Sequence, residues 1–140
     1  MQYSYRLLVF SLAVLLQACS STPQKPPEDL LSLTEAPMKI RSYQSRSYDA
    51  KDQKKVLRAV VAALLDLGFI IERVNVPLGL VTAGKFAKSG FVEATVTVRP
   101  KGEERMEIRA NALFNTRPIE DPKAYQNFFS AVQRSLFLSD

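Results

Sequence analysis

The chain has 140 residues but no histidine and only one cysteine, Cys19. Without histidine it lacks the most common general base near neutral pH and the usual protein ligand of zinc and copper. Carboxylates are present, but the pairs Glu103–Glu104 and Glu120–Asp121 fall in predicted turns or at a helix start. Glycosidase chemistry needs two carboxylates held across a rigid cleft. We therefore expect a protein that is not an enzyme and that needs no metal or cofactor.

One motif resembles the beginning of a phosphate-binding P-loop. Gly79, Gly84 and Lys85 have the G-x-x-x-x-G-K spacing, but Phe86 stands where a serine or threonine would bind magnesium. The surrounding residues are typical of a turn followed by a strand, whereas a P-loop opens a helix whose N-terminus faces the phosphate. Ser89 lies near Lys85 in the sequence, but such proximity is common by chance. The sequence thus predicts neither a nucleotide site nor a serine hydrolase.

The first 18 residues carry a single charge, Arg6, followed by an apolar run from Leu7 to Leu16. As a helix, this run would extend about 15 Å, half of the roughly 30 Å thickness of a bilayer core. A basic start and a short apolar middle are typical of a secretory signal. We therefore predict that residues 1–18 are a signal peptide rather than a membrane span.

The signal ends in Leu16-Gln17-Ala18-Cys19, which resembles the lipobox of bacterial lipoproteins. The resemblance implies that a diacylglyceryl group modifies the sulfur of Cys19 and that Cys19 becomes the first residue of the mature protein. Ser20 stands where aspartate would signal retention in the inner membrane, which implies the outer membrane. Two or more acyl chains anchor a protein stably, so we expect a lipid-anchored protein whose domain faces the periplasm. The alternative is an ordinary secretion signal followed by a free thiol.

Residues 19–36 are rich in proline, serine and threonine, a composition that resists packing and favours an extended chain. We interpret them as a tether between the lipid and a single domain at residues 37–140. The whole chain has a net charge of +5, which is only mildly basic. Nucleic acid is not expected as a partner of an exported, anchored protein, but an anionic envelope polymer, glycan or lipid fits a basic surface.

Helical periodicity is clearest between Asp49 and Gly68. Val56, Val60 and Leu64 fall on one face, as expected of an amphipathic helix that covers a core. We expect Asp49 to cap this helix at its N-terminus. Gly68 is predicted to end it, because glycine readily takes the positive φ found after a helix C-terminus.

Strands are predicted where apolar and polar residues alternate or β-branched and aromatic residues gather, namely at residues 38–48, 69–74, 80–86, 91–99 and 105–114. Asp121-Pro122 predicts the start of a second helix. The expected order is therefore β-α-β-β-β-β-α. We predict an α+β fold in which a four- to five-stranded antiparallel sheet carries two helices packed on one face.

The first predicted strand is polar and rich in residue types that dominate protein interfaces. Its candidate partner-binding residues are Arg41, Tyr43, Gln44, Arg46 and Tyr48. As an edge strand, it could add to the sheet of another envelope protein. One alternative is that these are ordinary exposed edge residues whose charges prevent aggregation. Another is that Lys39, Arg41, Arg46 and the lysines at the start of the following helix bind an anionic envelope polymer, glycan or lipid.

The segment from Arg41 to Lys85, RSYQSRSYDAKDQKKVLRAVVAALLDLGFIIERVNVPLGLVTAGK, resembles a family of small, poorly characterised proteobacterial envelope lipoproteins. The C-terminal stretch YQNFFSAVQRSLFL resembles the same family. The shared motifs are structural, with Gly68 as helix stop and Phe69 as a core residue. The resemblance implies an envelope lipoprotein and no particular reaction. We therefore expect an accessory module in envelope assembly or transport that binds another protein.

Overall fold

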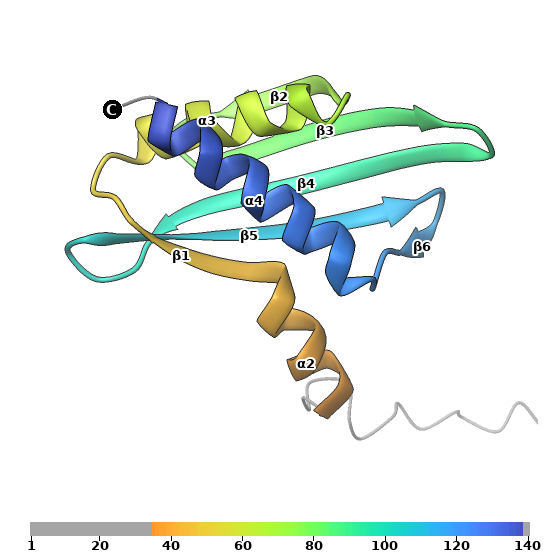
Figure 1. Cartoon of the computed structure of the whole chain (residues 1–140), viewed down its shortest axis with the longest axis horizontal. Coiled ribbons are helices and arrows are strands. Elements are labelled where there is room, and N and C mark those ends of the chain that lie inside the picture. The colour runs from red at the N-terminus through yellow and green to blue at the C-terminus, as the bar shows by residue number, and fades with distance from the viewer. Residues whose placement is uncertain (1–34, 139–140) are drawn as a thin grey trace, which may run out of the picture. The chain divides into compact units, whose positions relative to one another are not determined.

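The structure is a computed structural model that describes residues 35–138. The elements in this part of the chain are α2 (Glu35–Gln44), β1 (Ser45–Asp49), α3 (Gln53–Asp66), β2 (Ile70–Asn75), β3 (Leu80–Ala87), β4 (Gly90–Pro100), β5 (Arg105–Phe114), β6 (Arg117–Pro118) and α4 (Pro122–Leu138) (Figure 1). The predicted signal peptide, Cys19 and nearly all of the predicted tether lie outside the described residues.

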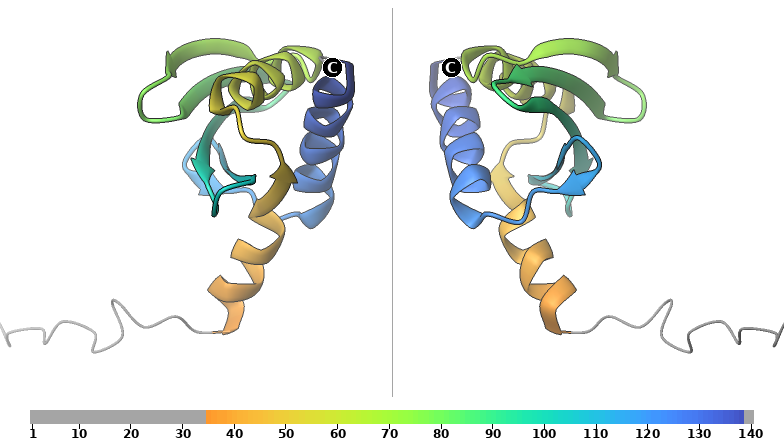
Figure 2. Two further views of the ribbon diagram at one scale, coloured as in Figure 1. Left: turned by 90° about the vertical axis from the view of Figure 1, so that its left-hand side faces the viewer. Right: turned by 90° about the vertical axis from the view of Figure 1, so that its right-hand side faces the viewer.

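The strands form one antiparallel sheet in the order β1-β5-β4-β3-β2, and the short β6 pairs with the C-terminal end of β5. Figures 1 and 2 show a strongly twisted sheet with α3 and α4 packed against one of its faces. The predicted α+β class and the predicted antiparallel sheet are confirmed. The predicted order of elements is confirmed from β1 to α4 except for the short β6, and the prediction missed α2.

The core lies between this face of the sheet and the two helices. The register pairs Val98 of β4 with Ile108 of β5, and both side chains are fully buried, as the alternation predicted. Val60 of α3 and Phe129 of α4 belong to the same buried cluster. The two-residue period of the strands and the helical period of α3 and α4 therefore place their apolar side chains in one interior.

The strand predicted at residues 38–48 is wrong over most of its length. The α2 helix extends to Gln44, and β1 begins only at Ser45. The sequence of α2 includes Met38, Lys39 and Arg41, which are all good helix formers. Their polar character resembled that of an edge strand, but local propensity favours the helix that the structure has.

The N-cap of α3 is Asp52 rather than the predicted Asp49. The Asp52 carboxylate accepts a hydrogen bond from the backbone N–H of Lys54 at 2.8 Å. Asp49 is instead the last residue of β1, opposite Arg105 of β5. Gly68 follows the end of α3 with a φ of 79°, so the predicted helix stop is confirmed.

Candidate functional site

The candidate residues on α2 make contacts within the domain. The Tyr43 hydroxyl donates a hydrogen bond to the carbonyl of Glu120 at 2.8 Å, in the loop that leads into α4. Gln44 is only 8% exposed, and its Nε2 donates to the hydroxyl of Tyr125 at 3.2 Å. Arg41 is exposed to solvent. The end of α2 is therefore fixed to the start of α4.

The candidate residues on β1 also face α4. The Tyr48 hydroxyl donates to the carbonyl of Phe129 at 3.0 Å. The guanidinium carbon of Arg46 lies 5.0 Å from the centroid of the Phe129 ring, within the range of a cation–π interaction. Burial raises the pKa of the Tyr48 hydroxyl, and the charge and hydrogen bond of Arg46 partly oppose that rise. The partner role of these residues stays a prediction, but their polar groups already have partners inside the domain.

The P-loop-like stretch is a turn followed by a strand, as predicted. Gly79 has a φ of 61°, and its carbonyl accepts a hydrogen bond from the N–H of Val98 at 2.7 Å. Lys85 lies in β3, and its Nζ donates to the carbonyl of Leu67 at 2.6 Å. A cation at this position favourably meets the negative end of the α3 dipole. Lys85 therefore binds a helix C-terminus, where a P-loop lysine would bind a phosphate.

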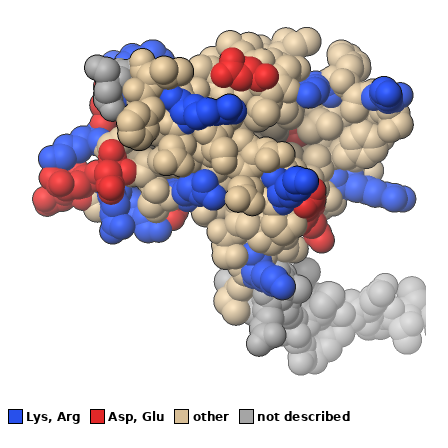
Figure 3. All heavy atoms as spheres, in the orientation of Figure 1, with Lys and Arg blue, Asp and Glu red and all other residues tan. Residues whose placement is uncertain are grey.

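Residues 35–138 contain no cluster of three histidine, cysteine or acidic side chains that could hold a metal ion. In the same range, none of the helices is both long enough and apolar enough to span a membrane. Figure 3 shows acidic and basic side chains mixed with one another and with uncharged surface on the face it presents, rather than one continuous basic patch.

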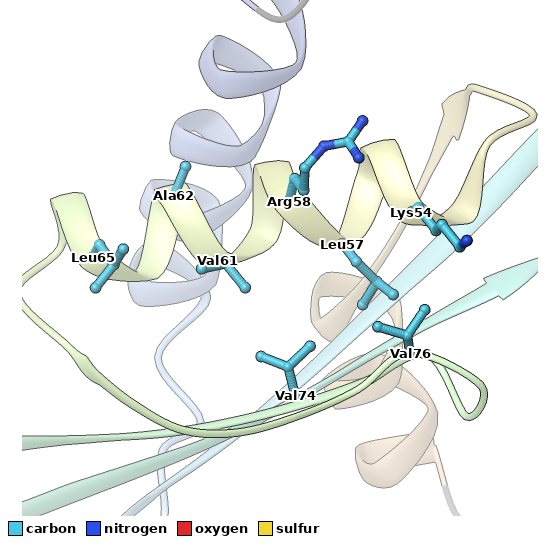
Figure 4. Close-up of a pocket in the computed structure, with 8 residues that line it drawn as sticks. All are labelled: Lys54, Leu57, Arg58, Val61, Ala62, Leu65, Val74 and Val76. Atoms are coloured by element: carbon cyan, nitrogen blue, oxygen red, sulfur yellow. The ribbon is translucent and has the colours of Figure 1, made fainter.

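A groove of about 560 Å³ lies between α3 and the strand β2 (Figure 4). It is lined by Lys54, Leu57, Arg58, Val61, Ala62, Leu65, Val74 and Val76. In Figure 4, Leu57 and Val61 point from the helix toward Val74 and Val76. Three of the lining aliphatic residues remain well exposed, at 54% for Leu65, 42% for Val74 and 39% for Val76. The groove is thus an apolar surface that the described residues leave open.

The groove lies beside an unpaired strand edge. Within the described residues, β2 pairs only with β3 and ends the sheet on that side. The register shifts between Ile71 and Arg73 and is regular from Arg73 to Asn75. Backbone N–H and C=O groups along the outer edge of β2 therefore lack a neighbouring strand next to the aliphatic groove.

The charged residues that line the groove are both basic. Lys54 lies at the end near Val76, whereas Arg58 extends from α3 away from the strand (Figure 4). No carboxylate lines the groove, and neither cation forms an ion pair with a described acidic residue. The groove therefore combines aliphatic contacts with uncompensated positive charge at one end.

Sequence reasoning missed this groove. The sequence predicted that the apolar face of α3 covers a core, and Leu57, Val61 and Leu65 of the groove lie beside that face. The signal was the width of the stripe, because a helix that covers a single sheet face leaves part of a wide stripe exposed. Val76, just beyond the end of β2, carried no strand alternation that would have marked it.

Comparisons with known proteins leave the family of this chain open. No protein-family model matches it, and no curated protein matches it significantly. The resemblance to envelope lipoproteins is therefore still an expectation.

Proposed function

We propose that this chain is an outer-membrane lipoprotein, anchored through Cys19, whose domain is a non-catalytic protein-binding module of the cell envelope. Its partner is an envelope protein that places an extended segment along β2. The observation that carries the proposal is the open aliphatic groove beside the unpaired edge of β2.

Strand addition supplies backbone hydrogen bonds, while side-chain pockets supply specificity. A segment added to β2 would place every second side chain against Leu65, Val74 and Val76, which are the exposed aliphatic residues of the groove. Pockets that bind ligands commonly have volumes of about 300–1,000 Å³, and the groove falls within this range.

The irregular start of β2 limits where a partner can pair. A bulge and charged residues on an edge strand are devices that hinder association, and both occur here at Glu72 and Arg73. The pairing with β3 is regular from Arg73 onward, and Val74 is the first uncharged residue of that regular part. We therefore expect a short pairing that starts near Val74 and continues toward Val76, beside Lys54.

The charge of the groove selects the partner segment. Because Lys54 and Arg58 have no acidic counterpart in the groove, the segment should carry an acidic residue near Lys54. Its aliphatic residues should follow toward Leu65. Complementary charge of this kind increases the association rate and fixes the register of the pairing.

Photocrosslinking in intact cells tests the proposal. A photoreactive amino acid is placed at Leu65 or Val76 in the groove and, as a control, at Phe86. Phe86 is exposed and lies in β3 beyond the residues that pair with β2. We expect both groove positions to crosslink the same envelope protein and Phe86 not to do so. Equal crosslinking from Phe86, or no protein adduct from either groove position, would contradict the proposal.

Two charge variants sharpen this test. Lys54→Glu should reduce the crosslink at least tenfold, and it preserves the fold because an acidic residue in the first turn of α3 suits the helix dipole. Lys39→Glu on α2 changes the net charge by the same amount outside the groove. If both variants weaken binding equally and salt abolishes it, the site is a general basic surface for an anionic polymer.

The membrane anchor has its own test. Mass analysis of the native protein should show acyl groups on Cys19 at the N-terminus, and Cys19→Ser should release the protein from the membrane fraction. An unmodified N-terminal methionine without acyl groups would contradict the anchor and the location at the outer membrane. That result would refute the anchor alone. The crosslinking experiment tests the groove of the domain separately.

A further inference from the structure

A second cavity lies between α4 and the face of the sheet that the helices cover, next to the C-terminal end of α3. Its volume is about 220 Å³. Alanines from β4 and β5 form its floor, and Phe69 and Phe128 are among its aromatic walls. Lys85 of β3 lines it together with these apolar groups. This cavity shares none of its lining residues with the groove beside β2.

Small side chains in register create the cavity. Ala94 of β4 pairs with Ala112 of β5, and Val96 pairs with Ala110. Farther along the same two strands, Val98 pairs with Ile108, and those larger side chains are fully buried. An apolar cavity that nothing fills destabilises a core in proportion to its volume. A ligand that fills the alanine-lined end would therefore offset this cost.

Lys85 is the cation of this cavity. Its Nζ donates one hydrogen bond, to the carbonyl of Leu67 at 2.6 Å, and lies 5.7 Å from the centroid of the Phe69 ring. An ammonium group has three N–H donors, so two remain for other acceptors. No described carboxylate forms an ion pair with Lys85. The side chain thus presents positive charge and free donors to an apolar space.

We propose that this cavity binds a medium-chain fatty carboxylate, with the acyl chain over the alanine floor and the carboxylate bound by Lys85. An acid of this kind matches both properties of the site, because it carries one negative charge on an otherwise apolar chain. A methylene group takes up roughly the 30 Å³ that a water molecule occupies in the liquid. The volume of about 220 Å³ therefore suits a chain of about seven carbons, as in octanoate.

The test uses the full-length protein in phosphatidylcholine nanodiscs with ¹³C-labelled alanine methyl groups, observed by NMR. Octanoate should shift the methyl signals of Ala94, Ala110 and Ala112 in a saturable manner. Ala112→Leu should abolish the shifts of the other two, because leucine fills the cavity. Octanoate that leaves the alanine signals unchanged would overturn the proposal.

Lysine variants separate a ligand contact from a purely structural role. Lys85→Met should weaken octanoate binding at least tenfold and leave octanol binding unchanged, because octanol has the same chain without the charge. Lys85→Arg should retain octanoate binding, and Lys88→Met serves as a matched control at an exposed position near the end of β3. If Lys85→Met weakens octanoate and octanol equally, or weakens neither, Lys85 only caps α3 and the proposal is wrong.

Discussion

Alanine at Gly79 should destabilise the domain far more than alanine at Gly102, although both glycines have a left-handed backbone. Their φ angles are 61° and 73°. A Cβ atom at Gly79 would lie 2.1 Å from the carbonyl oxygen of Val98 and 2.5 Å from Nε2 of Gln53. At Gly102 nothing lies within 4 Å of the corresponding position. The pair therefore separates the cost of backbone conformation from the cost of steric overlap.

The expected magnitudes follow from these contacts. A left-handed φ costs an alanine about 1–2 kcal/mol, and the stiffer unfolded chain returns about 0.4–1 kcal/mol. Gly102→Ala should therefore lose about 1 kcal/mol. At Gly79 the overlap adds about 1–3 kcal/mol of strain. It also disturbs the hydrogen bond from Gln53 to Val98, at 2.9 Å, which contributes about 1 kcal/mol.

Urea unfolding of the full-length protein, followed by circular dichroism, measures both variants. We expect Gly79→Ala to lose about 4 kcal/mol in the free energy of unfolding, with the same slope against urea as the parent protein. Losses that agree within about 0.5 kcal/mol at the two positions would refute the reasoning, because the turn would then have no close contact with β4.

Two further predictions concern tyrosine hydroxyl groups that face or belong to α4. Tyr125→Phe should lose about 3 kcal/mol in the free energy of unfolding in the same urea assay. The buried Tyr125 hydroxyl donates to the carbonyl of Ile119 at 2.7 Å and accepts from Gln44 and from the N–H of Ala112. A loss below about 1 kcal/mol would contradict this expectation. Burial raises the pKa of Tyr48 above its ordinary value of 10.0. As the pH rises above 10, the unfolded chain therefore releases this proton before the folded protein does. The stability of the folded protein falls as a result. Unfolding measured across this alkaline range should show a shallower decline for Tyr48→Phe, and identical slopes would argue against a buried hydroxyl.

Most of the fold could be predicted because its periodicities are local. The alternation along β4 and β5 identified the inward residues, and Asp121-Pro122 marked the start of α4 within one residue. Gly68 marked the end of α3, since a positive φ after a helix strongly favours glycine. In these places, the residue pattern and the tertiary structure demand the same conformation.

The α2 helix could not be predicted in the same way. Its sequence has no clear apolar stripe, and its C-terminal end is held by Gln44 and Tyr43, whose partners lie about 80 residues later in the chain. Such contacts leave no local pattern. Polar residues with a few aromatics fit an edge strand and a short surface helix about equally well, and tertiary contacts decide between them.

The groove beside β2 depends on strand order, which the sequence does not specify locally. Consecutive strands often pair, so β2 to β5 could be expected to form a meander. The position of β1 next to β5, rather than next to β2, leaves the outer edge of β2 unpaired. Had β1 paired with β2, the edge beside Val74 would not be available to another chain.

Residue type alone is therefore weak evidence for a partner surface in this domain. Arg and Tyr are enriched at binding hot spots because they combine a large apolar body with directional polar groups. The same properties suit them to fasten one element of a domain to another, as Tyr43, Arg46 and Tyr48 do against α4 and its leading loop. A surface meant for another molecule is better recognised by groups that lack partners within the domain. By that criterion, the open aliphatic side chains beside β2 are stronger candidates than the polar residues of α2 and β1.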